Sequence, residues 1–300
     1  MTELRFLSVC SGIEGASVAW HPLGWQCVGV SETSSFASSL ITQRWPGVPN
    51  FGDLRDFERW SHGPIDVLVG GPPCQSFSIV GTRTGMDDPR GDLARVFVAL
   101  AGRARPRWLV FENVPGLLSV NGGRDFASLL RGLWDCGYGV AYRIFDAQYF
   151  GVAQRRTRVW LVGRLGSWER AAAVLFDFAS MRGDPAPLRE SRQDAGRAPH
   201  DCIDLGGEMI SKALVSKKGS GYYFDGTAET LLVSQVDNAV RRLTPRECER
   251  LQGFPDDYTL VQYRGKPAKD GPRYRALGNA FPVPVVRWIG ERIELVEAIT

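Results

Sequence analysis

The chain has 300 residues, of which 44% are hydrophobic and 23% are charged, a balance typical of soluble globular proteins. No apolar stretch of about twenty residues occurs, which argues against a membrane-spanning helix, and the start MTELRFLSVC lacks the apolar core of a secretory signal. The net charge of +3 permits a nucleic-acid partner but does not indicate one. Six scattered cysteines without a CxxC pair argue against zinc and redox motifs, so we expect no metal and reduced thiols in a cytoplasmic protein.

Apolar runs and amphipathic stretches alternate over residues 1–165. In chain order they predict strands at 4–10, 26–32, 65–71, 107–114, 139–147 and 158–165, and helices at 14–25, 34–45, 92–106 and 125–138. Strands separated by helices predict βαβ units and a parallel sheet covered on both faces. Such sheets bind ligands beyond the carboxyl ends of their strands, so residues at those ends are the candidates for chemistry.

The alternation stops at about residue 166. Residues 166–240 are rich in Gly, Pro, Ser and Asp and hold only short β-like pieces, which indicates a small separate domain or a large insertion. Helical spacing returns at 244–254, and a long helix is expected at about 284–299. The predicted division is therefore 1–165, 166–240 and 241–300, with the last part returning to the first domain.

Two features at predicted strand ends together indicate a cofactor that carries a nucleoside. The turn CSGIEG (10–15) follows the first strand, and its glycines let backbone N–H groups approach a ligand closely. Glu32 ends the second strand, where an acid commonly accepts hydrogen bonds from ribose hydroxyls. A plain strand-to-helix turn and a residue next to a helix N-cap are the alternatives that the pattern leaves open.

The segment GGPPCQSFS (70–78) favours an exposed thiol at Cys74. Pro72 and Pro73 lack backbone N–H groups, so the preceding strand cannot continue as a central strand and the chain leaves the sheet extended. Polar residues follow, as in a loop. A buried core cysteine remains the alternative, because free cysteine is often buried.

Glu112 ends the strand WLVF, where partial burial would raise its pKa and make it a proton donor near neutral pH. A structural ion pair with an arginine is the alternative. Arg156 and Arg158 lie two residues apart at the start of a strand, so they share one face and can hold a thiolate and an anionic ring. They can equally be solvated surface charges.

The motifs GGPPCQSFS, FENV (111–114) and QRRTR (154–158), in this order, resemble the signature motifs of the DNA cytosine carbon-5 methyltransferases. The first turn, Glu32 and Asp53 in GDL are similar to further motifs of that family. So are two late segments, RRLTPRECERLQGFPDDY (241–258) and RYRALGNAFPVPVV (273–286). The resemblance covers nearly the whole chain outside 165–240.

Three positions depart from the family pattern, all near the expected adenine pocket. Cys10 stands where the family usually has an aromatic residue, Glu14 where it usually has a third glycine, and Thr33 where it often has a large apolar residue. Asp92, in RGDLAR, also has an unusual place.

The resemblance implies an α/β fold, namely a Rossmann-like S-adenosylmethionine-dependent methyltransferase sheet with a small inserted target-recognition domain. It implies these catalytic residues: Cys74, Glu112, Arg156 and Arg158. Implied contacts of S-adenosylmethionine are Cys10, Gly12, Ile13, Glu32, Thr33, Asp53, Leu54, Pro73, Leu93 and Asn279. The expected contacts with DNA are Gln75, Ser76, Ser78, Arg83, Lys217 and Lys218.

The implied reaction adds the Cys74 thiolate to carbon 6 of a cytosine and a methyl group to carbon 5. Glu112 would bond ring nitrogen 3, and the loop 76–92 would close over the flipped-out base. The expected partner is double-stranded DNA of one sequence, read by residues 166–240, with 216–224 nearest the DNA. We expect a monomer, and a cognate restriction endonuclease is left open.

Three rival functions remain open at this point. An RNA-directed enzyme acting on tRNA would share every catalytic residue. A thiol hydrolase needs a histidine near Cys74, whereas His21, His62 and His200 lie in no motif. A catalytically inactive DNA-binding regulator is opposed by the intact Cys74 and Glu112.

Overall fold

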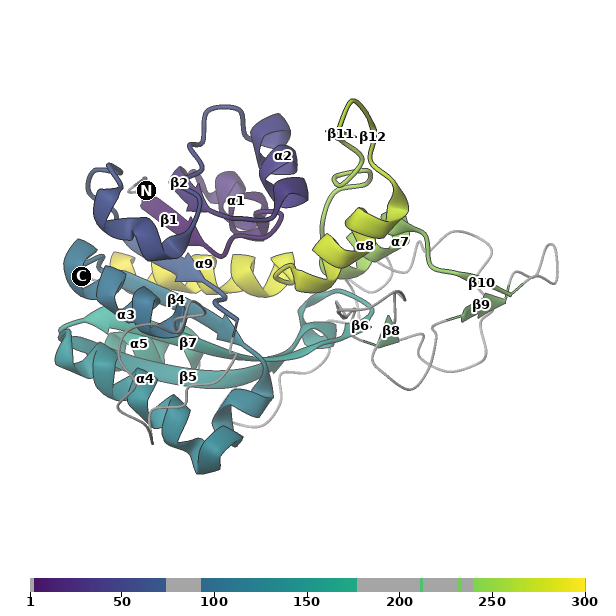
Figure 1. Ribbon diagram of the computed structural model, residues 1–300. Helices are drawn as coiled ribbons and strands as arrows, with labels where there is room; N and C mark the ends of the chain where they lie inside the picture. The colour runs from purple at the N-terminus through teal and green to yellow at the C-terminus, as the bar shows by residue number, and fades with distance from the viewer. Residues whose placement is uncertain (1–2, 74–92, 177–210, 213–230, 234–239, 300) are drawn as a thin grey trace.

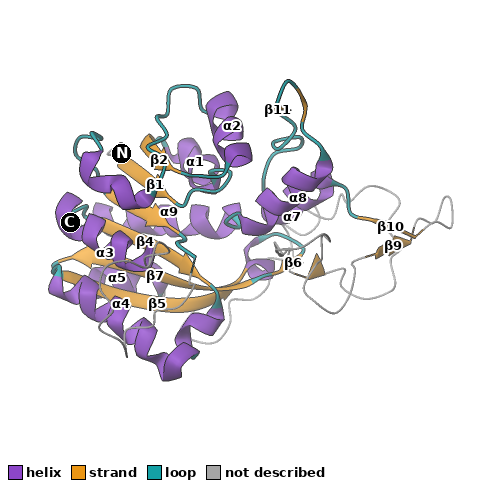
Figure 2. Cartoon of the chain, in the orientation of Figure 1, coloured by secondary structure: helices purple, strands orange, loops and turns teal. Residues whose placement is uncertain are grey.

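The structure of the protein is a computed structural model that describes residues 3–73, 93–176, 211–212, 231–233 and 240–299. At its centre lies a six-stranded sheet in the order β2-β1-β3-β4-β7-β5 (Figure 1). Its strands are β1 (Arg5–Val9), β2 (Gln26–Ser31), β3 (Val67–Gly70), β4 (Trp108–Asn113), β5 (Tyr138–Asp146) and β7 (Thr157–Leu165). Helices cover the sheet on both faces (Figure 2), which confirms the predicted α/β class.

The predicted parallel arrangement holds for four strands and fails at β7. Strands β2, β1, β3 and β4 pair in parallel, whereas β7 runs antiparallel to both β4 and β5. A parallel neighbour needs a long crossover connection, usually a helix. Between β5 and β7 the chain holds only the 3₁₀ helix η5 (Ala147–Phe150) and the short strand β6 (Gln154–Arg155), so β7 turns back beside β5.

Alternate residues of the central strands enter two separate cores. Phe6 and Val69 belong to the core beneath α1 (Gly15–Trp20), α2 (Ser35–Arg44), α5 (Trp168–Leu175) and α9 (Val283–Ala298). Leu7 and Leu68 belong to the core beneath α3 (Leu93–Ala104) and α4 (Arg124–Asp135). This alternation is the period-two pattern of a strand buried on both faces.

The C-terminal helix α9 packs against α1 at the start of the chain. The Trp20 Nε1 donates a hydrogen bond to the Val286 carbonyl over 2.8 Å. Gly290 permits this approach, because a Cβ there would lie 2.4 Å from Trp20 Nε1. Residues of α9 therefore form part of the first core.

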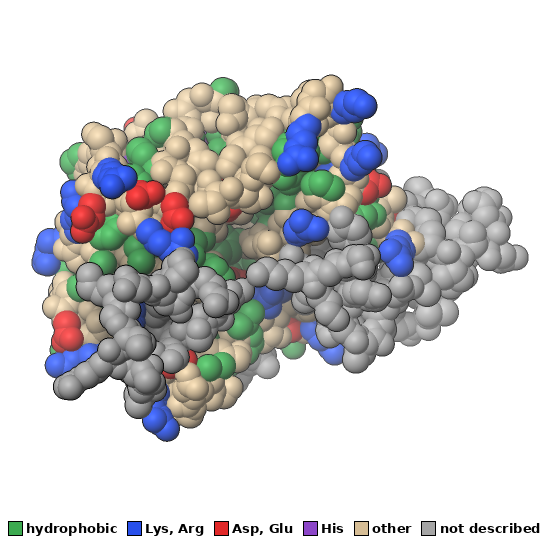
Figure 3. Space-filling model, in the orientation of Figure 1, with side chains coloured by type: hydrophobic (Ala, Val, Ile, Leu, Met, Phe, Trp, Pro, Cys, Tyr) green, Lys and Arg blue, Asp and Glu red, His purple; other side chains and the backbone are tan. Residues whose placement is uncertain are grey.

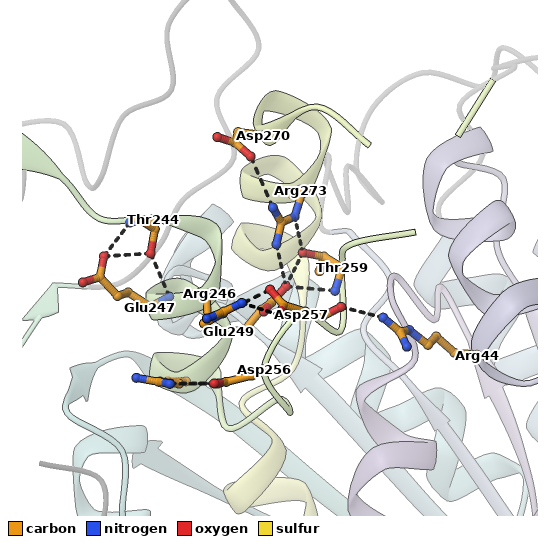
Figure 4. A network of polar contacts seen from close by, with 11 residues as sticks. Arg44, Thr244, Arg246, Glu247, Glu249, Asp256, Asp257, Thr259, Asp270 and Arg273 are labelled. Atoms are coloured by element: carbon orange, nitrogen blue, oxygen red, sulfur yellow. Dashed lines mark hydrogen bonds and ion pairs between the residues drawn. The ribbon is translucent and has the colours of Figure 1, made fainter. Parts of the chain in front are cut away.

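A buried polar network holds the late helices α7 (Pro245–Gln252) and α8 (Asp270–Asn279) together (Figure 4). Glu249 has no exposed surface, and its Oε1 accepts a hydrogen bond from the Thr259 backbone N–H at 2.8 Å. Arg273 lies against the same carboxylate at 3.3 Å and donates from Nε to Thr259 Oγ1 at 2.8 Å. A buried charge is tolerated only when it is paired and hydrogen-bonded. The network therefore fixes the position of α8 relative to α7.

Little of the region 166–240 falls within the described residues. Helix α5 lies there, yet Ala171, Val174 and Leu175 pack in the first core. The short strand β8 (Ser211–Lys212) pairs with β6, and β9 (Leu231–Val233) pairs with β10 (Val240–Arg242). The division into three parts therefore stays a prediction, with α5 attached to the main sheet.

The remaining short elements connect these layers. They are η1 (His21–Leu23), η2 (Leu54–Arg59), η3 (Pro115–Leu118), η4 (Val120–Gly123), β11 (Gln262–Tyr263) and β12 (Lys266–Pro267). Among the helices of the described residues, none has the length and apolar character that crossing a membrane requires.

Candidate active site

The turn after β1 has a backbone that few residues adopt. Cys10, Gly12 and Glu14 all have positive φ, at 50°, 55° and 61°. The Gly12 N–H donates a 2.7 Å hydrogen bond to Oε2 of Glu32, which directly follows β2. The carboxyl ends of β1 and β2 are thus joined through the two features from which the sequence predicted a cofactor.

Glu32 is held in place from both sides. Its Oε1 accepts a hydrogen bond from the Ser34 N–H at 2.6 Å, and its backbone N–H donates to Asn50 Oδ1 at 3.1 Å. Burial raises the pKa of Glu32, and the backbone N–H groups of Ser34 and Gly12 oppose that rise. The predicted ribose acceptor is therefore a pre-positioned carboxyl group at the sheet edge, and its contact with ribose stays a prediction.

Cys10 faces the same acidic corner. Burial, together with the charges of Glu32 and Asp53, raises the pKa of its thiol to about 12. Asp53 caps η2 by accepting from the Arg55 N–H at 2.9 Å and pairs with the Arg55 guanidinium at 2.8 Å. Cys10 is therefore a neutral, apolar side chain where the family usually has an aromatic ring.

Two predicted cofactor residues have buried side chains. Ile13 lies in the first core and Leu54 in the second, and the Tyr258 hydroxyl donates to the Ile13 carbonyl at 2.9 Å. Of the other predicted contacts, Thr33 and Pro73 are exposed and Leu93 is half-buried at the start of α3. Ile13 can therefore reach a ligand only through its backbone.

Asn279 brings the late part of the chain to the first turn. It is the last residue of α8, and its carbonyl oxygen lies 4.0 Å from where a Cβ on Gly12 would stand. A side chain at position 12 would thus fill the space between the two segments. The fold thus brings Asn279 beside the turn at Gly12, a closeness that the sequence alone does not predict.

Glu112 lies near the end of β4 and faces Arg158 of β7. Its Oε1 lies 3.0 Å from Arg158 Nε, and both side chains are about one-eighth exposed, at 12% and 13%. Burial raises the pKa of Glu112, while Arg158 and Arg156 lower it. Both sequence interpretations of Glu112, a buried acid and an ion-paired acid, describe the same side chain.

The segment that leads to Cys74 is held against this acid. The Asn113 Nδ2 donates a 3.0 Å hydrogen bond to the Pro72 carbonyl, and both atoms are buried. A Cβ on Gly71 would lie 3.2 Å from Glu112 Oε2 and 2.8 Å from the Phe281 ring, so only glycine fits. Asn113 was not among the residues predicted from the sequence. Its position next to Glu112 in FENV, together with the hydrogen-bonding capacity of its side-chain amide, could have indicated it.

Arg156 occupies a different place from the one expected. It is 3% exposed, and its guanidinium donates to the carbonyls of Gly278 at 3.2 Å and Ala280 at 2.9 Å. Burial, together with the charge of the neighbouring Arg158, lowers the pKa of Arg156 to about 9. These bonds connect α8 and Asn279 to β7, and the role of Arg156 in holding the substrate ring stays a prediction.

Several predicted residues lie outside the described residues. They are the nucleophile Cys74 and the DNA contacts Gln75, Ser76, Ser78, Arg83, Lys217 and Lys218. The loop 76–92, its unusual Asp92 and the segment 216–224 lie there too. Among the described residues, Pro72 is the one closest in sequence to Cys74 that hydrogen-bonds to β4.

Neither described histidine lies at the carboxyl edge of the sheet. His21 contacts Trp45 at the end of α1 that is farther from Gly12. His62 is exposed and precedes β3, at the opposite edge. Within the described ranges, no group of His, Cys, Asp or Glu could hold a metal ion. The thiol hydrolase hypothesis thus has no histidine support among these residues.

Comparison with known proteins agrees with this geometry. A family model for C-5 cytosine-specific DNA methylase matches residues 4–183 and 189–295. The chain is 30% identical to the Type II methyltransferase M2.BsuMI of Bacillus subtilis (strain 168), covering 97% of this chain and 75% of that protein. It is 29% identical to the Type II methyltransferase M.HpaII of Haemophilus parainfluenzae, covering 97% and 89%.

A phage relative has a different name. The chain is 32% identical to the "DNA N-6-adenine-methyltransferase" of Escherichia phage P1, over 98% of this chain and 61% of that protein. The chain thus spans about three-fifths of that relative.

The fold is shared with solved structures. The S. pombe Dnmt2 methyltransferase superposes with a TM-score of 0.65 at 18% identity, covering 98% of this chain and 99% of that one. A putative DNA modification methyltransferase from an E. coli prophage superposes with a TM-score of 0.65 at 17% identity, covering 99% and 100%. Because the family model matches almost the whole chain, the chain belongs to the C-5 cytosine-specific DNA methylase family, whose reaction is methyl transfer from S-adenosylmethionine to carbon 5 of cytosine in DNA.

Proposed function

We propose that this chain methylates carbon 5 of a cytosine within one specific double-stranded DNA sequence, with Cys74 as the covalent nucleophile. The observation that carries the proposal is the hydrogen bond that connects β4, which holds Glu112, to the segment that leads to Cys74. Glu112 is buried beside Arg158, and its neighbour Asn113 holds the Pro72 carbonyl, two residues before Cys74. An acid, a cation and the approach to a thiol therefore share one edge of the sheet.

Cytosine carbon 5 is a poor nucleophile, and this arrangement addresses that difficulty. Addition of the Cys74 thiolate to carbon 6 moves electrons toward carbon 5, while Glu112 gives a proton to ring nitrogen 3. The bound S-adenosylmethionine supplies an electrophilic methyl group, which carbon 5 accepts. A base, for which a water molecule is the candidate, then takes the carbon-5 proton, and the Cys74 thiolate is expelled. Glu112 regains its proton from ring nitrogen 3. Arg158 would favour the thiolate by its charge.

The residues at the first turn fit S-adenosylmethionine. Glu32 keeps lone pairs free beside its two backbone N–H bonds, so it can accept from ribose hydroxyls. The space beside Gly12, bordered by the Asn279 carbonyl, would face the methionine carboxyl end. Asp53 would receive the adenine amine, and the neutral Cys10 would supply apolar contact to the ring. Thr33, Leu54, Pro73 and Leu93 complete the proposed pocket.

The target base lies inside a duplex and must be flipped out, at a cost of a few kcal/mol. We assign closure over that base to residues 76–92 and reading of the sequence to part of 166–240, with Lys217 and Lys218 on phosphates. Relatives named Type II methyltransferases support a role in restriction–modification. A cognate endonuclease and a monomeric enzyme belong to this proposal.

Two other substrates compete with this one. The phage relative's name points to adenine, yet more than a third of that relative lies outside the match. An exocyclic amine already offers a nitrogen nucleophile, so methylating it needs no thiol. An RNA substrate would use the same catalytic residues, but the relatives at about 30% identity are named Type II methyltransferases.

The deciding experiment expresses the chain in a host without DNA methylation and measures nucleosides by mass spectrometry. We expect 5-methylcytosine in DNA, no N6-methyladenine above the empty-vector level and no rise of 5-methylcytosine in RNA. Bisulfite sequencing then maps the methylated motif. N6-methyladenine in place of 5-methylcytosine, or methylation confined to tRNA, would reject the proposal.

A further inference from the structure

A cationic surface lies outside every residue so far assigned to DNA. Residues 260–279 hold five Lys and Arg but one Asp, a net charge of +4, whereas the whole chain carries only +3. Four of these cations are exposed: Arg264, Lys266, Lys269 and Arg275. We call these four residues the hairpin patch. Figure 3 shows Lys and Arg side chains over the β11–β12 hairpin and α8. This short segment therefore has a larger net positive charge than the chain as a whole.

The nearby acids are already engaged, so they do not neutralise the patch. Asp270 pairs with the buried Arg273 at 3.2 Å. Asp256 and Asp257, on the preceding turn, pair with Arg250 and Arg246. No residue of the hairpin patch forms an ion pair with any other described residue. The patch thus keeps its charge available for an external anion.

The β11–β12 hairpin, which carries Arg264 and Lys266 of the patch, is fixed to α2. The Gln43 side chain donates to the Gln262 carbonyl at 2.7 Å and accepts from its N–H at 2.9 Å. The Tyr263 hydroxyl lies 2.8 Å from Ser35 Oγ, and its ring packs edge-on against Phe36. Cations on an anchored hairpin lose less backbone entropy on binding than cations on a free loop.

The turn itself breaks a local rule. Arg264 and Gly265, between the two strands, have φ of 54° and 74°. A two-residue hairpin turn with positive φ at both positions prefers Asn-Gly, and an arginine at the first position is costly. Packing does not explain the arginine, because its side chain is exposed over the Tyr263 ring. A locally unfavourable, exposed residue is a mark of function.

Lys269 of the patch stands one helix length from the turn at Gly12, whereas Arg275 lies within that helix. Helix α8 begins beside Lys269 and ends at Asn279, next to Gly12, and Arg156 binds the carbonyls on either side of Asn279. Ten helical residues extend about 15 Å. Since phosphates of one DNA strand are about 3.4 Å apart, this length corresponds to four or five base pairs.

We propose that the hairpin patch binds phosphates of the DNA flank, with Lys269 about four or five base pairs from the turn at Gly12. The inference rests on the proposed DNA substrate. Phosphate contacts fix the register of a protein on the duplex and carry no sequence information themselves. The patch would therefore add affinity for every DNA sequence and leave the methylated motif unchanged.

The test compares two triple variants with the same change in charge. The patch variant is Arg264→Ala, Lys266→Ala and Lys269→Ala. The control variant is Arg59→Ala, Arg105→Ala and Arg131→Ala, three exposed cations at or beside the amino-end edge of the sheet. Binding to a 30-base-pair duplex of arbitrary sequence is measured from 50 to 200 mM salt. This readout needs no methylation, so it can fail or succeed independently of the proposed function.

Each lost phosphate contact lowers the slope of log affinity against log salt by about 0.9. The patch variant should lose about 2.7 from that slope, so a fourfold rise in salt should cost wild type about 40-fold more affinity than it costs the variant. The double variant Lys266→Ala/Lys269→Ala leaves the turn intact and should lose about 1.8. S-adenosylmethionine affinity and the methylated motif should stay unchanged. A patch variant with the slope of the control, or a preference for duplex RNA over DNA, would overturn the inference.

Discussion

Replacing Glu14 with Gln should stabilise the protein above neutral pH. Glu14 has no exposed surface, and its Oε1 accepts from the Ser17 N–H and Oγ, both at 3.0 Å. Its Oε2 is buried without a hydrogen-bond partner. Burial raises the pKa of Glu14 from 4.5 to about 7, against hydrogen bonds from Ser8, Ser17 and Ser11. A glutamine side chain keeps the acceptor for Ser17 and carries no charge.

The direction of the pH dependence follows from linkage. The folded pKa lies above the unfolded value, so the folded state binds the proton more tightly and stability falls as pH rises from 4.5 to about 7. Each pKa unit corresponds to about 1.4 kcal/mol. The wild type should lose about 3.4 kcal/mol in all through Glu14 as pH rises from well below 4.5 to well above 7, and Glu14→Gln should not.

Denaturant unfolding at pH 4.5, 6 and 8 measures this difference. The free energy of unfolding of Glu14→Gln minus that of wild type should rise by about 3 kcal/mol between the lowest and the highest pH. Glu291→Gln on the exposed side of α9 is the control for removing a surface carboxylate. A difference for Glu14→Gln that is flat or falls with pH would refute the reasoning.

Three further predictions concern the active site. Glu112→Gln keeps the shape but loses the acid, so the methylation rate should fall about 10²–10⁴-fold; a loss below about threefold would leave Glu112 with a structural role only. Glu32→Ala should weaken S-adenosylmethionine binding about ten- to a hundredfold, because a buried charge-assisted hydrogen bond is worth about 1.5–3 kcal/mol; unchanged affinity by calorimetry would contradict this. Asn113→Ala leaves the Pro72 carbonyl without its donor and should lower kcat up to about a hundredfold through misplacement of Cys74. Its S-adenosylmethionine affinity should stay at the wild-type value, and an unchanged kcat would show that the bond does not position the thiol.

Local sequence patterns could predict which site residues lie at the ends of strands. Glu32 and Glu112 terminate or follow apolar runs, and a buried strand of a parallel sheet places its last residues at the ligand edge. The helices also matched closely: the pattern at 92–106 corresponds to α3 (Leu93–Ala104), and that at 284–299 to α9 (Val283–Ala298). These features depend on residues near in sequence.

The features that the sequence did not predict depend on long-range packing. The reversal of β7 follows from a missing crossover helix, and a run such as RVWLVGRL has the same apolar pattern in either direction. Arg156 looked like a partner of Arg158 because period two placed them on one face. Its actual acceptors, the carbonyls of Gly278 and Ala280, lie more than 120 residues away. The Asn113–Pro72 bond joins two motifs that only the sheet brings together.

The central claim, a covalent Cys74 adduct with cytosine, is tested most directly by trapping on DNA that contains 5-fluorocytosine in the methylated motif. The fluorine cannot leave as a proton does, so the adduct formed after methyl transfer persists. With S-adenosylmethionine present, the wild type should give a denaturation-resistant complex whose peptide mass assigns the link to Cys74, and Cys74→Ala should give none while still binding DNA. A complex that survives in Cys74→Ala, or a link at any of the other five cysteines, would contradict the account.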